Sequence, residues 1–305
     1  MYLIETNNLC KKYGNSLVID HVSMHVPEHS IYGFVGENGS GKTTIMRLLT
    51  GLAEVTSGSF TLFGYQNNDR RINEAKKQVS AIVEIPALVP SLSARDNMIY
   101  QELYLGVKLS DEERDNLIRL VNLESAKDKK VRNYSLGMRQ RLAIALALIS
   151  KPKLMFLDEP MNGLDPEGIA ELRQLLIDLN KNEGITILIS SHILSELEKI
   201  ATNYGFISHG HLIEEITTEE LQNRCRKSII LNVNDVKKAE EVLKKIPVKS
   251  YQILPNGDVT IYDEVKIKDV VLAMTSNDVE VLNIHSNEES VEDYYLNLIK
   301  NREAK

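Results

Sequence analysis

One segment near the start of the chain combines the residue types needed to bind a phosphate group. Residues 36–44, GENGSGKTT, fit the pattern GxxxxGK[ST], and the apolar run 31–35 leads into them. Glycines permit backbone angles and close approaches that let successive N–H groups converge on a phosphate. We therefore predict nucleotide contacts from Gly36, Glu37, Asn38, Gly39, Ser40, Gly41, Lys42, Thr43 and Thr44.

Lys42 and Thr43 give this loop its specific chemistry. In such a loop the lysine ammonium reaches the β and γ phosphates, and the threonine hydroxyl ligates Mg²⁺. A predicted helix over 43–49 points its positive N-terminal end at the same phosphates. A glycine-rich turn that binds nothing is the alternative. It is disfavoured because strand, loop and helix all fall where the motif requires them.

A pair of carboxylates follows a later apolar strand. In KLMFLDEP the apolar run 154–157 is followed by Asp158 and Glu159. Buried carboxylates are costly unless a metal ion or another partner offsets their charge. Since ligands of parallel sheets bind at the carboxyl ends of the strands, we predict that Asp158 faces Mg²⁺ and Glu159 faces an attacking water.

His192 and Ser135 occupy two further positions suited to anions. His192 follows the apolar strand 185–191, so we predict a γ-phosphate contact rather than an ordinary surface or core histidine. Ser135 precedes a predicted helix that Pro152 ends, and Gly137 leaves the first turn bare. A hydroxyl and bare N–H groups at a helix N-terminus bind anions, although capping alone also explains Ser135.

Composition narrows the class of protein. The chain has 305 residues, enough for about two domains, and 43% of them are apolar. A net charge of −7 argues against a dedicated nucleic-acid binder. Cys10 and Cys225 are far apart in sequence and are expected to be reduced thiols of a cytosolic protein. No apolar run approaches the ~18 residues of a membrane span, so we expect neither secretion nor a span.

Short strands and helices must position these residues. Strands are predicted over 2–9 and 17–26, and Tyr13 in the turn between them is placed either to stack on a base or to cover a sheet edge. Residues 57–65 indicate a hairpin, 68–130 an inserted helical subdomain, and Asp165 the N-cap of a helix that Gly184 ends. The loop 81–97 is broken by two prolines, and its apolar residues are predicted to form a docking surface: Ile85, Leu88, Val89 and Leu92.

The end of the chain differs in character. A hairpin is predicted over 206–215, a short helix over 218–223 and a basic linker over 224–227. The order that follows is strand 228–233, helix 236–246, strands 250–254 and 259–262, helix 267–274, strand 279–285 and a closing helix 291–299. This is the order of a small split βαβ domain. It carries no catalytic or metal-binding spacing, so an accessory or dimer-stabilising role is preferred over ligand sensing.

Together these motifs resemble those of the nucleotide-binding subunit of an ABC transporter, over about residues 1–222. GENGSGKT corresponds to the Walker A loop, YSLGM to the signature, LMFLDEP to the Walker B strand, GLD to the D-loop with Asp165, and His192 to the switch histidine. The resemblance implies an α/β fold, a P-loop NTPase ABC cassette with a mixed core sheet and antiparallel β and helical subdomains. A small C-terminal α+β domain, 228–305, follows the cassette.

The resemblance also implies a role for each motif residue. Tyr13 stacks on adenine, Lys42 and Thr43 hold phosphate and Mg²⁺, Asp158 supports the Mg²⁺, and Glu159 is the general base, with His192 on the γ-phosphate. Ser135, Leu136, Gly137 and Met138 contact the γ-phosphate held by a second copy. Leu136 and Met138 replace a glycine and a glutamine of the usual LSGGQ. Glu84 stands where the Q-loop carries glutamine, and a carboxylate there still ligates Mg²⁺ while bringing negative charge toward the triphosphate.

The implied function is hydrolysis of ATP, with Mg²⁺, by a homodimer of cassettes at the cytoplasmic face of the cell membrane, where it drives a separate permease. No nucleic-acid partner is expected. The segment VEIPALVPSLSARDN resembles exporter cassettes of bacitracin and lantibiotic self-protection systems. The alternatives are a general ABC-2-type multidrug or lipid exporter and a non-transport ABC ATPase, which usually has paired cassettes or a long coiled coil. A metabolic kinase would lack YSLGM. The exported compound and the permease are left open.

Overall fold

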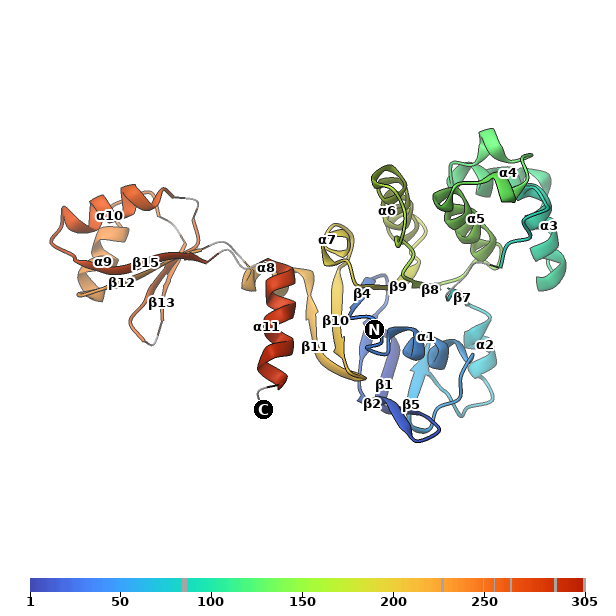
Figure 1. Ribbon diagram of the computed structural model, residues 1–305, viewed down its shortest axis with the longest axis horizontal. Helices are drawn as coiled ribbons and strands as arrows, with labels where there is room; N and C mark the ends of the chain where they lie inside the picture. Colours follow the sequence, from blue (N-terminus) through green and yellow to red (C-terminus); the bar gives the residue numbers. More distant parts are fainter. Residues whose placement is uncertain are drawn as a thin grey trace. The chain divides into compact units, whose positions relative to one another are not determined.

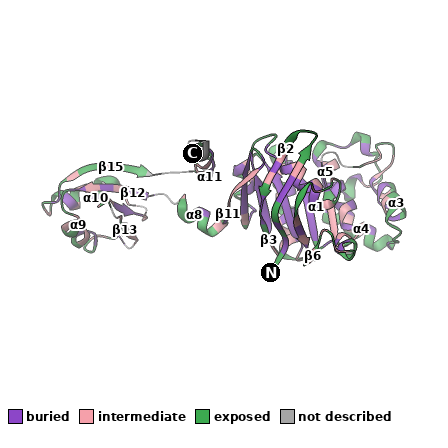
Figure 2. Ribbon diagram, turned by 90° about the horizontal axis from the view of Figure 1, so that it is seen from below, coloured by how far each residue is buried: buried purple, intermediate pink, exposed green. Residues whose placement is uncertain are grey.

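The computed structural model describes residues 1–83, 87–225, 228–248, 250–254, 256–263, 265–287 and 290–303. The chain divides into two compact units, Met1–Thr218 and Glu219–Lys305 (Figure 1). Buried residues recur along the strands of both units (Figure 2). Each unit therefore has a core of its own. In the described part of the chain, no helix is both long enough and apolar enough to cross a bilayer.

A six-stranded sheet forms the centre of the first unit. Its strand order is β11-β10-β4-β9-β8-β7, and all neighbours are parallel except the hairpin β10–β11. The strands are β4 Ile31–Val35, β7 Val79–Ile82, β8 Leu154–Asp158, β9 Thr186–Ser191, β10 Asn203–Ser208 and β11 His211–Thr217. Because β9 lies between β4 and β8, the carboxyl ends of these three strands lie side by side.

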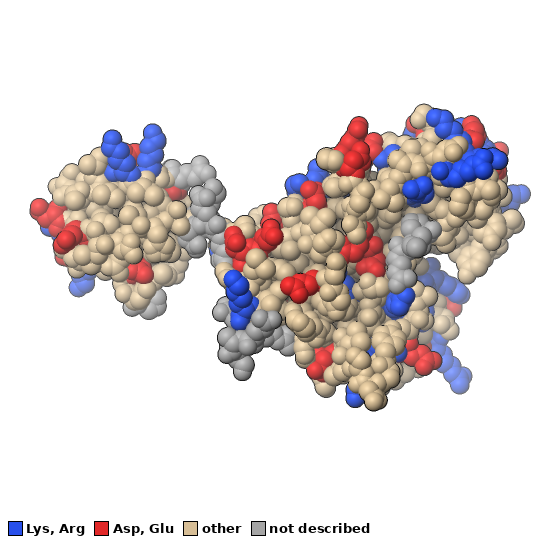
Figure 3. All heavy atoms as spheres, in the orientation of Figure 1, with Lys and Arg blue, Asp and Glu red and all other residues tan. Residues whose placement is uncertain are grey.

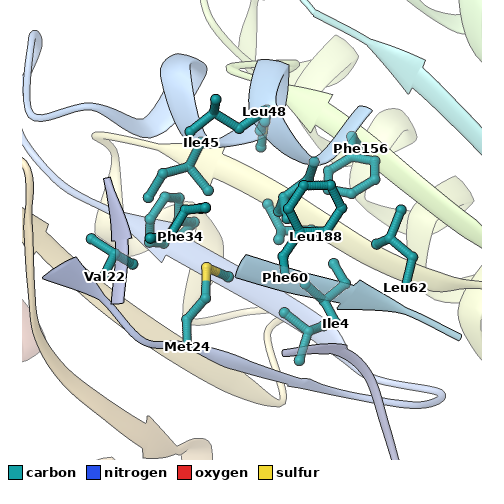
Figure 4. Close-up of a cluster of buried hydrophobic side chains, with 14 of the residues drawn as sticks. Ile4, Val22, Met24, Phe34, Ile45, Leu48, Phe60, Leu62, Phe156 and Leu188 are labelled. Atoms are coloured by element: carbon teal, nitrogen blue, oxygen red, sulfur yellow. The ribbon is translucent and has the colours of Figure 1, made fainter. Parts of the chain in front are cut away.

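A second, antiparallel sheet packs against the core through helix α1, Lys42–Thr50. Its strands are β1 Tyr2–Tyr13, β2 Ser16–Val22, β3 His25–Pro27, β5 Ser57–Leu62 and β6 Tyr65–Gln66. Figure 4 shows the apolar cluster that joins these elements, with Ile45 of α1, Phe34 of β4 and Phe60 of β5, all buried. Truncating a buried phenylalanine typically costs about 3–5 kcal/mol. The two elements that flank the loop between β4 and α1 are therefore held in place by close packing.

The segment that leads into the helical subdomain contains one strand of the core sheet that the sequence did not reveal. The helices of the subdomain are α3 Ala94–Leu105, α4 Asp111–Leu120 and α5 Leu136–Leu148, with 3-10 turns at Glu124–Ala126 and Val131–Asn133, whereas α2 Ile72–Lys76 packs against β5 and β6 of the antiparallel sheet. The prediction of a helical subdomain over 68–130, with a loop over 81–97, was wrong at β7, which pairs in parallel with β8. Four residues are too few to show a period, and their conformation is decided by pairing with a distant strand.

Ion pairs cover the outer surface of the helical subdomain. Arg95 lies 2.8 Å from Asp111 and 3.5 Å from Asp115, and Lys127 lies 3.5 Å from the same Asp115 carboxylate. In Figure 3 basic side chains gather over this subdomain at the upper right. Solvent-exposed pairs contribute little to stability, because water screens them and ordering long side chains costs entropy.

The other helices of the first unit are α6, Pro166–Lys181, and α7, Leu194–Leu197. Together with α5 they lie on the face of the core sheet opposite α1 (Figure 1). Asp165 caps α6 by accepting a hydrogen bond from the Gly168 N–H at 3.2 Å, and Pro166 occupies its first position. The helix therefore begins where the sequence predicts, because Asp165 caps it and Pro166 fits its first position.

The second unit follows the strand and helix order predicted from the sequence. Its elements are α8 Thr218–Arg224, β12 Ser228–Val233, α9 Val236–Leu243, β13 Tyr251–Ile253, β14 Val259–Ile261, α10 Ile267–Thr275, β15 Val281–Asn287 and α11 Val291–Glu303. The sheet order is β13-β14-β12-β15, with antiparallel neighbours throughout. Leu231, Val259 and Met274 lie in its buried apolar cluster. This is the arrangement of a split βαβ unit.

Candidate nucleotide-binding site

The loop 36–41 turns tightly between β4 and α1, and two of its glycines are required by geometry. A Cβ on Gly36 would lie 2.4 Å from the carbonyl oxygen of Ile207, which no real side chain tolerates. Gly41 has a φ of 110°, outside the range of ordinary L-residues, and it caps α1. The N-terminal end of α1 therefore faces the loop, as a phosphate-binding site needs.

Lys42 lies buried inside this loop, with 5% of its surface exposed. Its Nζ donates to the carbonyl oxygens of Gly36 at 2.6 Å and Glu37 at 3.1 Å. The same nitrogen lies 3.4 Å from Oε1 of Glu159. A buried ammonium requires such partners, and these hold its charge at the centre of the loop.

The structure brings Thr43 and Asp158 together from separate elements. Thr43 Oγ1 donates to Asp158 Oδ2 at 2.7 Å, and Asp158 is buried. Two hard oxygen donors side by side next to a phosphate loop are the ligand set that Mg²⁺ prefers, so these residues fit the ion.

Ser190 is a site residue that the sequence analysis missed. Its hydroxyl donates to Asp158 Oδ1 at 2.6 Å and accepts the Glu159 N–H at 2.9 Å. Ser190 is fully buried on β9, next to β8. The available signal was a hydroxyl inside the apolar strand 185–191, because a buried polar side chain needs a partner. Ser190 fixes the orientation of both carboxylate residues.

Glu159 has the most unusual environment in the site. Its φ of 47° is uncommon for a residue with a side chain, and strained backbone of this kind clusters at functional sites. Oε2 lies 2.7 Å from Nδ1 of His192. Oε1 is buried and makes no hydrogen bond within the described part of the chain, although the Lys42 charge is near. One oxygen is thus oriented by His192, and the other is able to accept a proton.

Tyr13 lies at the end of β1, where it pairs with Ser16 of β2. The ring is 46% exposed, and the Lys11 ammonium lies 4.8 Å from its centroid. The ring therefore keeps an open surface on which a base can stack. In the phosphate loop, Glu37, Asn38 and Gly39 are also exposed.

The signature residues form a second group, at the N-terminus of α5. Ser135 Oγ accepts the Met138 N–H at 3.2 Å, so it caps its own helix. Leu136 is 44% exposed and packs near Gly163, whose added Cβ would lie 3.2 Å from the leucine side chain. Gly137 is buried. The contacts of this group run to its own helix and to the segment before α6, rather than to the phosphate loop.

The D-loop lies beside the signature in the same unit. A Cβ on Gly137 would lie 3.8 Å from Cα of Gly168, in the first turn of α6, and Asp165 caps that turn. Glu84, the predicted Q-loop ligand, lies outside the described residues.

These features define a class of protein. A parallel sheet that carries a phosphate loop, an Asp-Glu pair and a histidine at neighbouring strand ends is a P-loop cassette built to bind and hydrolyse a nucleoside triphosphate. Residues 19–162 match the family described as ABC transporter. The chain belongs to the ATP-binding proteins of ABC transporters. It therefore binds ATP and is an ATPase, which confirms the predicted fold class and family.

Curated relatives match nearly the whole chain. The bacitracin transport ATP-binding protein BcrA of Enterococcus faecalis is 40% identical over 98% of this chain and 96% of its own length. BcrA of Bacillus licheniformis is 38% identical over 97% of both chains. The lantibiotic transport ATP-binding protein SrtF of Streptococcus pyogenes is 45% identical over 70% of this chain and 90% of its own length.

Solved structures show the same fold. cbiO1 from Clostridium perfringens, part of the ABC transporter complex cbiONQ, has a TM-score of 0.66 at 24% identity and covers 81% of this chain and 96% of that chain. The ATP-binding cassette MJ0796, in a dimeric post-hydrolysis state bound to ADP and Pi, has a TM-score of 0.62 at 24% identity and covers 70% of this chain and 98% of that chain.

Proposed function

We propose that this chain is the ATPase subunit of an exporter that protects the cell from a bacitracin-like peptide antibiotic, through a separate membrane permease. The observation that carries the proposal is the extent of the similarity to BcrA. It covers 97–98% of the chain and therefore includes both compact units. A cassette shared only for its ATPase chemistry would not need to keep the second unit.

Lantibiotic export is the second candidate, because SrtF has the higher identity, 45%. The 213 matched residues make up 90% of SrtF, which leaves no room in that protein for a complete second unit. The bacitracin class is therefore preferred for a chain that carries both units. A general multidrug or lipid exporter remains the alternative that the experiment below addresses.

In the proposed reaction Glu159 accepts the proton of the attacking water, and His192 holds the carboxylate in place through its 2.7 Å contact. Lys42 and the loop N–H groups neutralise and orient the triphosphate. Thr43, Asp158 and Glu84 would hold Mg²⁺, which when bound supplies positive charge against the triphosphate. Tyr13 would stack on the adenine.

The signature group is proposed to complete the nucleotide site of a second copy. Ser135 and Leu136 are exposed, and their own contacts lead away from the phosphate loop of the same chain. A homodimer of cassettes would thus enclose ATP between the phosphate loop of one copy and Ser135–Met138 of the other, with Asp165 of the D-loop near the contact. We propose the residues 228–305 as an accessory domain that stabilises this dimer.

A cavity beside the core sheet is the proposed docking site of the permease. It measures about 260 Å³ and includes residues on both sides of the segment 84–86. Its walls are formed by Leu52, Ala81, Ile82, Val83, Ala87, Leu88, Gln101, Ala143, Leu146 and Ala147. An apolar wall of this kind suits a cytoplasmic helix of a membrane protein at the cell membrane. Leu88, Val89 and Leu92 of the predicted docking loop are half-buried rather than free.

Glu84 is proposed to couple the nucleotide state to the permease. With the permease coexpressed, Glu84→Gln keeps an oxygen ligand and should preserve export, whereas Glu84→Ala should impair export more than the basal ATPase rate of the purified chain. Full protection of cells by Glu84→Ala would show that Glu84 has no coupling role.

The export function is tested by survival of a sensitive host that expresses this chain together with its permease. We expect a higher tolerance of bacitracin with the native chain and none with Glu159→Gln at equal protein level. A lantibiotic and a chemically unrelated drug are tested in parallel. Equal protection against all three compounds would favour a general exporter, and protection against none would refute export of this class.

A further inference from the structure

Three side chains of metal-binding types meet at the pairing of β1 with β2. One ligand atom each from Cys10, Asp20 and His21 lies within 4.8 Å of the others. Among the described residues, it is the one group of three or more such side chains close enough to hold an ion. His21 Nδ1 lies 2.5 Å from Asp20 Oδ1, and the His21 N–H points at Cys10 Sγ at 3.3 Å.

A β-bulge creates this group. Leu9 pairs with Val22 and Lys11 pairs with Ile19, so the single residue Cys10 faces two residues of β2, Asp20 and His21. In a regular strand those two side chains would point to opposite faces. The bulge and the left-handed conformation of His21, with a φ of 49°, bring both toward the same thiol. Bulges re-aim side chains at functional sites.

His211, on a third strand, lies next to Asp20 of this group. Its Nε2 lies 3.4 Å from the second oxygen of Asp20. The hairpin that carries it is held in place, since the Asp20 N–H donates to the Gly210 carbonyl at 2.9 Å. Cys10 is buried, whereas the His21 side chain is 70% exposed. The group thus has a buried thiol at its base and an exposed histidine ring that contacts Asp20.

We propose that Cys10, Asp20, His21 and His211 bind one divalent transition-metal ion, with Zn²⁺ as the best match. Thiolate, imidazole and carboxylate are the ligands of Zn²⁺, whereas Mg²⁺ and Ca²⁺ prefer oxygen alone. Tetrahedral ligands about 2.0–2.3 Å from an ion are roughly 3.3–3.8 Å apart, so shifts of about 1 Å bring Cys10, Asp20 and His21 to an ion, and His211 would join them from its contact with Asp20. On binding, the Cys10 thiol releases its proton to solvent and the thiolate coordinates the ion.

The site is linked to the phosphate loop through the same hairpin. Gly210, whose carbonyl accepts the Asp20 N–H, also donates its own N–H to the Ser40 carbonyl at 2.9 Å. This one residue therefore contacts both Asp20 and the phosphate loop. Ile19 packs against Gly41, whose added Cβ would lie 2.5 Å from it. A bound ion would therefore join β1, β2 and β11 directly beneath the nucleotide loop and restrict the movement of that loop.

The test titrates the full-length, nucleotide-free chain with Co²⁺, a spectroscopic probe for Zn²⁺ sites. We expect one equivalent to bind with a thiolate-to-cobalt charge-transfer band, and Zn²⁺ to abolish the band. Cys10→Ser should lose the band, whereas the matched control Cys225→Ser should keep it. The oxygen ligands Thr43 and Asp158 cannot produce such a band. Its absence from the native chain, or its persistence in Cys10→Ser, would overturn the proposal.

Because Cys10 is buried, a second pair of variants keeps the test decisive if Cys10→Ser does not fold. His21→Ala and His211→Ala alter partly or largely exposed side chains, and each should weaken Zn²⁺ binding in equilibrium dialysis by at least about tenfold. His29→Ala, an exposed histidine that contacts Glu28, is the control and should bind as the native chain does. Unchanged affinity in both His21→Ala and His211→Ala would show adventitious binding only.

Discussion

Two acid-base pairs in the first unit, each with a buried cation, differ in how completely their hydrogen bonds are satisfied. Arg114 of α4 donates to both oxygens of Glu102, at 2.6 and 3.2 Å, and also to the Leu109 carbonyl and to Asp111. Glu102 also accepts the Leu109 N–H at 3.0 Å. Every polar atom of this carboxylate has a partner, which is the condition for a buried ion pair to support a fold.

The pair of Lys42 and Glu159 is built differently. Its nitrogen and oxygen are 3.4 Å apart, one buried oxygen of Glu159 makes no hydrogen bond with a described residue, and the Glu159 backbone is in the left-handed region. Incomplete satisfaction is costly for stability. The contrast indicates that the pair of Arg114 and Glu102 stabilises the fold. The pair of Lys42 and Glu159 instead has polar atoms available to bind a ligand and water.

The largest effect is expected at the incompletely satisfied pair. Glu159→Gln removes the proton acceptor but keeps the shape, so steady-state ATP hydrolysis should fall by about 10²–10⁴-fold while ATP binding remains. An ATP-bound dimer should then accumulate in size-exclusion chromatography. If the variant hydrolyses ATP at a near-normal rate, the base lies elsewhere, and His192→Ala becomes the next variant to measure.

A large but conditional effect is expected at Ser135, which lies away from both pairs. Ser135→Arg adds bulk and charge that clash only when two copies close, so the monomer should bind ATP with nearly native affinity while dimer formation and hydrolysis are lost. Ser135→Ala is the control: it removes the cap, at a cost of about 1 kcal/mol, without the clash. Loss of ATP binding by the Ser135→Arg monomer would contradict the composite site.

A smaller effect is expected at Ser190, which orients Asp158 and Glu159 in the nucleotide site. Ser190→Ala removes the hydroxyl that contacts Asp158 and the Glu159 N–H, so kcat should fall by about 10–100-fold, together with a loss of about 1–3 kcal/mol in the free energy of unfolding. Ser191→Ala is the matched control, because its hydroxyl contacts Ile193 instead. Equal loss of activity in both variants would indicate a general defect of β9 rather than positioning by Ser190.

The satisfied pair should affect stability and leave catalysis unchanged. Glu102→Gln leaves the buried Arg114 with only the exposed carboxylate of Asp111 as a countercharge, and the free energy of unfolding should fall by about 3 kcal/mol, measured by urea denaturation. The ATPase rate per folded molecule should not change. Glu74→Gln, which breaks the exposed pair with Lys77, is the control and should have no measurable effect on stability. A loss of ATPase turnover in folded Glu102→Gln would show that this pair also supports catalysis, contrary to the proposed difference between the two pairs.

The same pair should show a pH dependence. Burial by itself raises the pKa of Glu102, but hydrogen bonds from Arg114 and the Leu109 N–H outweigh it and hold that pKa below the usual 4.5. Its stabilisation is therefore fully present above about pH 5 and is lost as the pH falls through the lowered pKa. The difference in unfolding free energy between native chain and Glu102→Gln should shrink on acidification. A constant difference would show that Glu102 is not ionised in the fold.

Local chemistry fixed much of this molecule before any tertiary contact was known. The glycine and lysine spacing of 36–44, the cap at Asp165 and the apolar strands before Asp158 and His192 were readable because they depend on the conformational limits and burial of nearby residues. The ABC cassette fold and the family followed from them and are confirmed. The roles of the individual site residues remain predictions.

Tertiary structure decided which residues from distant segments pair and contact one another. β7 is a strand because β8 pairs with it, and Ser190 is a site residue because β9 places it between the Asp158 carboxylate and the Glu159 N–H. The bulge that turns His21 toward Cys10 and the hairpin that brings His211 to Asp20 likewise leave no local pattern in the sequence. Each depends on strand register, which is set by long-range pairing and packing rather than by the preferences of the residues themselves.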